Sequence, residues 1–340
     1  MVQARLRNVR LAAVIAETGW SHAQVANAFV RVASENGARV FAGVGRSHVS
    51  HWVGGSHPSG WAPVILCEAL SRRLGRTITL DEIGLTVQSL SSRAALDWRV
   101  DTLITLTDLG KVDIDMERRR VLAAATYSVA ALAVPGEPWW TQMAARGTTR
   151  ATASARGVGR GDLEAVREMA SIFSRLDQRR GGGHARTALV QYLTSDVASY
   201  LRGSYTDEQV RKDTFSAASE LAYLSGWMAF DNAEHSIAQH YFSIAVKLAA
   251  EADDPPMAGH VLRAMAHQAV DLGHFRQGLE LAAASMDGKR YLLASPRERA
   301  LLSVVYARAL GATGQKSAAA EALIKAEDDP VRFRDPARRG

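Results

Sequence analysis

Apolar residues recur at intervals of three and four along nearly the whole chain, and the nine prolines fall at the ends of these stretches. Such spacing gathers apolar side chains on one face of a helix, whereas a half-buried strand alternates at every second residue. No sustained alternation of that kind occurs in the sequence. The pattern therefore predicts an all-α protein.

The first 88 residues contain five short periodic stretches, which predict one small helical bundle. The first helix is expected over Gln3–Glu17, ending near Gly19, and the second opens at Ser21, which has capping-box spacing with Gln24. The apolar face of the second helix is expected to consist of Val25, Ala26, Ala28, Phe29 and Val32. The other three are a short helix capped by Ser47, a helix over Pro63–Leu74, and a helix capped by Thr79 and Glu82.

A unit of two helices repeats in the C-terminal half of the chain. Small and aromatic residues follow the order of a tetratricopeptide repeat at Gly226, Ala229, Ala238, Phe242 and Ala245. Two weaker units follow, with equivalent turns at residues 233, 273 and 314, spaced by 40 and 41 residues. An earlier helical hairpin over residues 163–180 and 184–201 would extend this array. An ordinary helical bundle is the alternative.

A chain of 340 residues exceeds the usual size of a single core, so more than one domain is expected. We predict a helical bundle over residues 1–88, a helical linker region over 89–160, and a helical repeat domain over 161–335. The linker would hold helices at 96–109 and 116–133, followed by GTTRATASARGVGRG, whose composition is typical of a mobile connection.

Positive charge is concentrated near the N-terminus. Residues 1–80 contain nine arginines and three glutamates, a formal charge of +6 that equals the charge of the whole chain. A compact basic segment on a neutral body is typical of nucleic-acid binding, since phosphate neutralisation supplies most non-specific affinity. A solvated arginine-rich surface is the alternative.

The remaining composition indicates a globular protein, with 47% hydrophobic and 22% charged residues. No apolar run is long enough to span a bilayer, and no leader peptide is evident. The single cysteine, Cys67, lies in the apolar run PVILCEAL, where we expect a small buried hydrophobe. We therefore expect a cytoplasmic, nucleoid-associated protein.

The stretch GRSHVSHWVGGSHPSGW at residues 45–61 is the richest in candidate chemistry. His48, His51 and His57 could bind zinc, but only Cys67 and Glu68 lie near enough in sequence to complete the site. Its serines lack the strand–turn–helix context of a catalytic nucleophile, and neither G-x-S-x-G nor a phosphate-binding loop occurs in the chain. A zinc enzyme stays a minor hypothesis, and we expect neither enzymatic activity nor a metal or cofactor.

A third interpretation of this stretch is a helix that binds DNA. Val49 and Trp52 are three residues apart and can point into the bundle, and Gly54 and Gly55 would end the helix. The remaining surface would then carry Arg46, Ser47, His48, Ser50 and His51. Polar and basic side chains at the start of a helix can reach phosphates and base edges in the major groove.

Val49-Ser50-x-Trp52-x-x-Gly55 resembles the I-S-x-W-x-x-G signature of the recognition helix in lambda-repressor-like, xenobiotic-response-element regulators. Gln24-Val25-Ala26-x-x-Phe29 is similar to the preceding helix of that helix-turn-helix family. Longer stretches, including RSHVSHWVGGSHPSGWAPVILCEALSRRLGR and EMASIFSRLDQRRGGGHARTALVQYL, resemble actinobacterial regulators that join this domain to tetratricopeptide-like repeats. The two-part layout resembles the peptide-sensing RRNPP regulators.

The resemblance implies a dimeric transcription regulator, in some relatives one of sporulation or antibiotic production. It implies that Arg46, Ser47, His48, Ser50 and His51 face double-stranded DNA and that Gln24 and Arg39 contact phosphates. The chain departs from the family between its two DNA-binding helices, where residues 35–46 replace a turn of three or four residues. This insert is expected to form a longer turn or a small hairpin.

The repeat array would present a concave face to a peptide, a small ligand or a protein partner. Its expected lining is Glu220, Tyr223, Trp227, His260, Arg263, His267 and Arg308. Aromatic rings offer apolar area and arginines pair with carboxylates, a combination that suits a peptide or an acidic segment. Burial of Tyr223 and Trp227 in the core is the alternative. For the whole protein, the alternative to a DNA-binding regulator is an interaction adaptor that does not bind DNA.

Overall fold

The computed structural model describes residues 7–35, 38–58, 62–76, 78–80, 82–85, 96–114, 127–150, 156–181 and 185–328. The described chain is 77% helical, which confirms the all-α prediction. The only strands in the described part are β1 (Gly157–Val158) and β2 (Ser204–Tyr205), which pair in parallel. No described helix is both long and apolar enough to cross a membrane.

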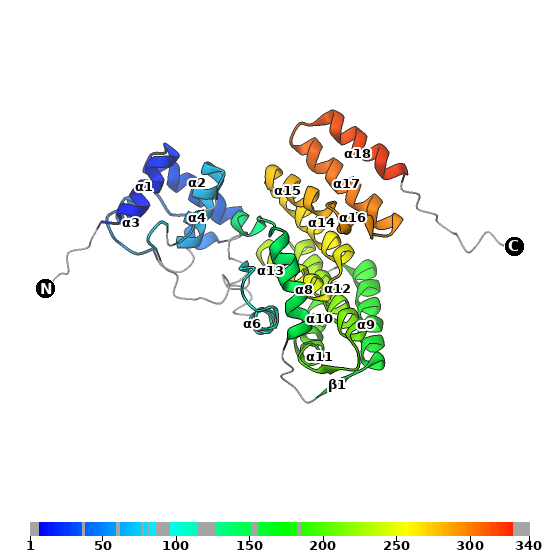
Figure 1. Cartoon of the computed structure of the whole chain (residues 1–340). Helices are drawn as coiled ribbons and strands as arrows, with labels where there is room; N and C mark the ends of the chain where they lie inside the picture. Colours follow the sequence, from blue (N-terminus) through cyan, green and yellow to red (C-terminus); the bar gives the residue numbers. More distant parts are fainter. Residues whose placement is uncertain are drawn as a thin grey trace.

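The helices lie around two separate apolar cores. The smaller core belongs to an N-terminal bundle made of α1 (Val9–Thr18), α2 (His22–Glu35), α3 (Arg46–Val53), α4 (Ala62–Leu74) and the 3-10 turn η1 (Arg39–Phe41). Figure 1 shows this bundle in blue to one side of the remaining helices. Two cores are consistent with the length of the chain, which exceeds the usual size of a single core.

The larger core belongs to a C-terminal body that starts well before residue 161. Its first elements are α6 (Thr102–Ile114), η2 (Val129–Leu132), α8 (Glu137–Thr149), α9 (Arg160–Arg180), α10 (Arg186–Tyr192), the π-helix η3 (Leu193–Val197) and α11 (Ala198–Tyr200). The later ones are α12 (Glu208–Asp231), α13 (His235–Ala252), α14 (Pro255–Asp271), α15 (Phe275–Ser285), α16 (Lys289–Leu292), α17 (Pro296–Ala312) and α18 (Lys316–Asp328).

Local signals in the sequence set the helix ends of the bundle. Asn8 caps α1 by accepting a hydrogen bond from the Leu11 amide at 2.9 Å, and Gly19 ends that helix with a φ of 68°. The predicted capping box forms: the Ser21 amide donates to Gln24 Oε1 at 2.9 Å, and the Gln24 amide donates to Ser21 Oγ at 3.3 Å. The predicted apolar face of α2 is buried in full.

Three expectations for the bundle are wrong. The first helix begins at Val9 and not at Gln3, because Asn8 is its N-cap residue. Ser47 does not cap α3, because Gly45 is the N-cap residue and Ser47 lies within the helix. The fifth helix is a turn in its described residues: the Glu82 amide donates to Thr79 Oγ1 at 3.2 Å, but Gly84 then takes a φ of 61°. A left-handed residue two positions after Glu82 stops the helix at its first turn. The described bundle thus contains four helices and this turn.

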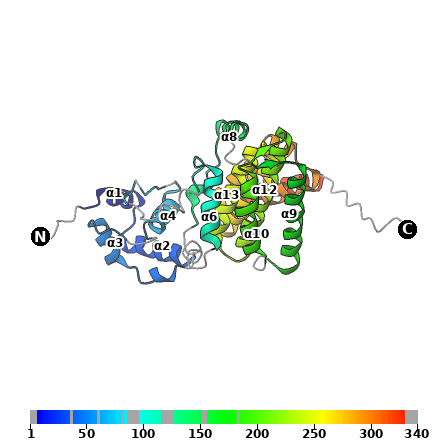
Figure 2. The ribbon, with the colours of Figure 1, turned by 90° about the horizontal axis from the view of Figure 1, so that it is seen from below.

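The region expected to be a linker packs into the C-terminal body. The helix predicted over 96–109 begins only at Thr102, as α6, whose Leu103, Leu106 and Leu109 belong to the larger core. Of the helix predicted over 116–133, only residues 127–133 are described, and η2 lies there. Residues 151–155 of the expected mobile connection lie outside the described residues, and 147–149 belong to α8. The described helices of residues 89–160 therefore pack on the C-terminal body and do not form a separate linker. Figure 2 shows α6 alongside α13.

Helix α13 is the centre of the C-terminal body. It packs against α12, α14, α8 and α6, and every residue from Ser236 to Ala252 is buried. A helix that is covered on all sides buries polar side chains as well as apolar ones. A buried polar side chain generally needs a hydrogen-bond partner. Lys247 is one example: its ammonium donates to the carbonyl of Asp97 at 2.5 Å.

Three helix pairs, α12–α13, α14–α15 and α17–α18, follow one another with equivalent turns. The turns between the paired helices lie at the predicted positions, and each contains one residue with a positive φ. Among the described residues between paired helices, these are the only ones with a positive φ: Ala233 (59°), Gly273 (82°) and Gly314 (82°). After each, the next amide donates to the carbonyl five residues earlier: Glu234 to Ala229, His274 to Ala269, and Gln315 to Leu310. This shared helix-ending motif explains the spacing of 40 and 41 residues found in the sequence.

Small residues at predicted positions allow the pairs to pack closely. A Cβ atom on Gly226 would lie 2.7 Å from the Phe242 ring, and one on Gly278 would lie 2.7 Å from Val270 Cγ2. The earlier hairpin predicted over 163–201 differs from these pairs. There α9 packs mainly along α12, and α10 packs on α6 and α12. Because α9 and α10 each have their main apolar contacts with other helices, they do not form a hairpin like the later pairs.

Candidate nucleic-acid interface and ligand groove

The two faces of α3 have the character that the sequence predicted. Val49 and Trp52 are buried, and the Trp52 ring lies 5.3 Å from that of Phe29 on α2. The five residues proposed to face DNA are exposed, namely Arg46, Ser47, His48, Ser50 and His51. Gly54 ends the helix, followed by Gly55 with a φ of 97°. The short helix is thus anchored by its apolar face and displays a polar and basic one.

Three of the proposed contact residues already make intramolecular hydrogen bonds. Ser50 Oγ is hydrogen-bonded to Nδ1 of His22 at 2.9 Å, which ties α3 to the start of α2. The Gly45 amide donates to Nδ1 of His48 at 3.2 Å, and the Gln24 amide oxygen accepts from Ser21. His48 and Gln24 therefore act as helix caps in this structure. Arg46, Ser47 and His51 are left as the most available side chains on α3.

Sequence reasoning missed His22 as a member of this surface. It is the first residue of α2, where the chain offers no periodic signal for a contact 28 positions away. Its pairing with Ser50 becomes evident only once the angle between α2 and α3 is fixed by Phe29 and Trp52.

The insert between α2 and α3 forms a longer turn in its described part, with η1 inside it. Phe41 packs edge-on against Phe29 at 5.7 Å, and Ala38 is buried. Arg39 begins η1, but its side chain lies outside what the structure describes, so its expected phosphate contact stays a prediction. Residues 36 and 37 lie outside it as well.

The few acidic residues of the bundle form ion pairs with arginines that are distant from α3 in sequence. Arg72 binds both Glu35 and Glu68, and Arg76 binds Glu17 at 2.6 Å and Glu82 at 2.7 Å. All three carboxylates of residues 1–80 are thus bound to the two arginines at the end of α4 or just beyond it. They do not neutralise Arg46, so the exposed face of α3 keeps its positive charge.

Two of the three histidines of residues 45–61 make hydrogen bonds with the main chain. His48 accepts from Gly45, and Nδ1 of His57 is hydrogen-bonded to the carbonyl of Pro58 at 3.0 Å. Cys67 is buried, as predicted. Across the described residues, no group of three or more histidine, cysteine or acidic side chains could hold a metal ion.

The predicted concave face of the repeats corresponds to an open groove of about 740 Å³. Five of the seven predicted residues line it: Glu220, Tyr223, Trp227, His260 and Arg263. The other two continue the same face beyond the groove: Arg308 donates to the imidazole of His267 at 2.9 Å, and that ring lies 5.9 Å from Trp227. Residues that sequence reasoning missed come from α9 and α17, among them Asp177, Arg297 and Leu301.

Arg263 is the notable charge in this groove. Its side chain is 5% exposed, yet no carboxylate lies within 4 Å of it in the described residues. Its guanidinium donates to the Tyr223 hydroxyl at 3.1 Å and lies 5.8 Å from the Trp227 ring centroid, and its Nε has no hydrogen-bond partner among the described residues. The same guanidinium lies 3.4 Å from Nε2 of His260, so this buried cation is held by a phenol and an imidazole rather than by direct contact with a carboxylate.

The neighbours of Arg263 are held in a fixed arrangement. His260 contacts Glu298 through Nδ1 at 2.7 Å and packs edge-on to Tyr223 at 4.4 Å. Burial opposes ionisation of Glu298, but the hydrogen bond and charge of His260, together with the charges of Arg263 and Arg297, outweigh it and lower the pKa of that carboxyl. Glu298 and Arg263 thus contact opposite nitrogens of the His260 ring and are joined through it rather than by direct contact.

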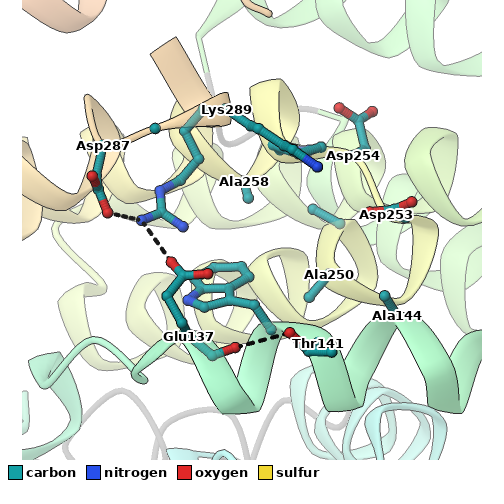
Figure 3. A pocket seen from close by; sticks show the side chains of 14 residues that line it. Glu137, Thr141, Ala144, Ala250, Asp253, Asp254, Ala258, Asp287 and Lys289 are labelled. Carbon is teal, nitrogen blue, oxygen red and sulfur yellow. Dashed lines mark hydrogen bonds and ion pairs between the residues drawn. The ribbon is translucent and has the colours of Figure 1, made fainter. Parts of the chain in front are cut away.

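A second hollow of about 590 Å³ lies between α8, α14 and α16. Figure 3 shows Glu137 and Asp287 at one end and Asp253 and Asp254 at the other. Its buried arginine, Arg290, has what Arg263 lacks: its guanidinium donates to Asp287 at 3.0 Å and to the carbonyl of Ala284 at 2.6 Å. Arg290 thus contacts a carboxylate directly and Arg263 does not, which makes the groove at Arg263 the better candidate for a ligand.

Comparison with known proteins adds one finding. A family model described as the SP15 N-terminal domain matches residues 11–86. This range coincides with the N-terminal bundle, from the first turn of α1 to the turn that contains Ile83 and Leu85. No curated protein and no solved structure matches the chain.

Proposed function

We propose that this protein is a sequence-specific DNA-binding transcription regulator. The bundle of α1–α4 would be a lambda-repressor-like helix-turn-helix domain, with α2 and α3 as its two characteristic helices. The observation that carries the proposal is the face of α3 that displays Arg46, Ser47 and His51 while Val49 and Trp52 hold the helix against α2.

The electrostatics of the bundle support this proposal. Its acids are bound to Arg72 and Arg76, so Arg46 and the exposed Arg31 of α2 remain available to phosphates. One such module reads a single half-site, and useful specificity then requires a homodimer. The dimer would bind two half-sites about one helical turn, roughly 34–36 Å, apart.

The helix pairs from α12 to α18 would be tetratricopeptide-like repeats that bind an effector. The buried Arg263, which contacts no carboxylate directly among the described residues, together with Tyr223 and Trp227 supports a peptide or small ligand that carries a carboxylate. In a regulator, such binding would alter the affinity for DNA, in the control of development or secondary metabolism that the resemblance implies.

Selection of duplexes from a random pool by the full-length protein, followed by gel-shift titration at several salt concentrations, tests the proposal. We expect enrichment of a two-fold symmetric motif and an affinity that falls steeply with salt. Replacing both Arg46 and His51 by alanine should abolish the enrichment. If the unmodified chain binds no duplex at low salt, or the double variant binds equally well, the protein is instead an adaptor that acts through its groove.

A further inference from the structure

A short segment, residues 127–132, lies between the two cores and bonds to both. On the bundle side, the Val129 amide donates to Glu68 Oε2 at 3.1 Å. On the other side, Gln239 of α13 binds both main-chain groups of Ser128: the Ser128 amide donates to its Oε1 at 2.8 Å, and its Nε2 donates to the Ser128 carbonyl at 2.7 Å. Two adjacent residues of this segment are thus bound to different cores.

The segment also contacts the turn that follows α14. The rings of Tyr127 and His274 are parallel, with centroids 5.5 Å apart, and both side chains are buried. His274 comes three residues after the end of α14, the helix that carries His260 and Arg263 in the groove. A helix of 17 residues spans about 25 Å and moves as one body, so a shift of its groove end is felt at His274.

On the bundle side, Glu68 connects the segment to α2. Glu68 is 4% exposed, and burial raises the pKa of its carboxyl although the neighbouring Arg72 opposes the rise. Arg72 Nε donates to Glu68 at 2.9 Å, and the same guanidinium binds Glu35 at the end of α2. Since α2 supports α3, direct contacts run from the segment to the surface proposed to bind DNA.

We propose that residues 127–132 form a latch through which the groove controls the N-terminal bundle. This inference rests on the proposed function for its biological meaning, but not for its test. With the latch closed, α4 is held on the C-terminal body; with the latch open, the bundle is free to change its orientation. An anionic ligand at Arg263 shifts the balance only if it binds the two states with different affinity, and the α14–His274 connection provides the means.

Hydrogen–deuterium exchange of the full-length protein tests the hold of the latch. Gln239→Ala removes both bonds to Ser128, and we expect amides of residues 62–74 and 127–132 to exchange about fivefold faster or more, as the loss of roughly 1 kcal/mol implies. Gln268→Ala is the matched control, since Gln268 is buried to the same degree on α14 and its Nε2 donates to His235 instead, at 2.9 Å. It should leave α4 within about twofold of the unmodified protein.

Equal exchange in α4 for the two variants would overturn the latch. If Gln239→Ala does not fold, Gln239→Glu replaces it, because the glutamate keeps the shape and the acceptor for the Ser128 amide but loses the donor. The same comparison with Gln268→Glu then applies. No DNA is present in these measurements, so a failure of DNA binding would not affect them.

Control by the groove is tested by a double-mutant cycle. Arg263→Gln neutralises the buried cation, as an anionic ligand would, and should change exchange in α4 about threefold when the latch is intact. With Gln239→Ala also present, the same substitution should have almost no effect on α4. An equal effect in both backgrounds, or no effect in either, would overturn the proposal that the latch transmits the state of the groove.

Discussion

The imidazole of His274 lies parallel to the ring of Tyr127, with only 10° between the ring planes, at the place where the two halves of the protein meet. Burial, reinforced by the charge of Arg72, lowers the pKa of His274 to about 4. In the unfolded chain this histidine binds a proton near its ordinary pKa of about 6.5. The stack is therefore maintained by a neutral imidazole.

Acidification should destabilise the protein through His274. Between pH about 6.5 and about 4 the unfolded state binds a proton that the folded state does not, so the free energy of unfolding falls as the pH falls, by on the order of 2–3 kcal/mol in total. His274→Phe keeps an aromatic ring on Tyr127 and removes the titration. Urea unfolding at pH 7 and pH 4.5 should show a smaller loss for the variant, and equal losses would contradict the assignment.

Gly226→Ala should destabilise the first helix pair. The added methyl group would lie 2.7 to 2.8 Å from two ring atoms of Phe242, so the helices must separate, at a cost of about 1–3 kcal/mol. Gly311→Ala is the control, because Gly311 is also helical but has nothing within 4 Å of its Cβ position. Thermal unfolding should show a lower midpoint for the first variant and an unchanged or slightly higher one for the second.

Ala233→Gly should stabilise the protein by about 0.5–1 kcal/mol, because the turn requires a φ of 59° that disfavours a side chain. Gly273→Ala places a methyl group at the equivalent turn of the next pair and should cost about 1 kcal/mol. Nothing lies within 4 Å of the Cβ position at Gly273, so the effect there is conformational rather than steric. Chemical denaturation should show changes of opposite sign in the free energy of unfolding of the two variants, which would confirm that the two turns are equivalent.

Arg46→Ala should weaken DNA binding without altering the fold, since its side chain is exposed at the start of α3. If Arg46 contacts one phosphate, the slope of log affinity against log salt should become shallower by about one. Arg175→Ala, which removes an exposed arginine from α9, is the control and should leave that slope unchanged. Titrations at three salt concentrations separate the two, and equal slopes would exclude Arg46 from the interface.

Local signals in the sequence determined much of this fold. The capping box of Ser21 and Gln24, the inward side of α3, and the turns at 233, 273 and 314 depend on residues within a few positions of one another, and each was predicted. The periodicity also placed five of the groove residues on a common face, because α12 and α14 present that face at every third or fourth position.

Tertiary structure decided which elements pack together. The region predicted as a linker joins the larger core, since Leu103, Leu106 and Leu109 find apolar partners far away in sequence. Likewise, α9 packs on α12 rather than on α10. A helical period shows that one face will be buried, but it carries no information about which partner buries it.

The chemistry of the two candidate sites shows the same division. The residue types at α3 and in the groove were evident from the sequence, but the capping role of His48, the bond between His22 and Ser50, and the contact of Arg263 with Tyr223 and His260 were not. The latch at residues 127–132 likewise depends on Glu68 and Gln239, which are 171 positions apart. Hydrogen bonds over such separations are set by the closure of the whole fold, which no local pattern of residues encodes.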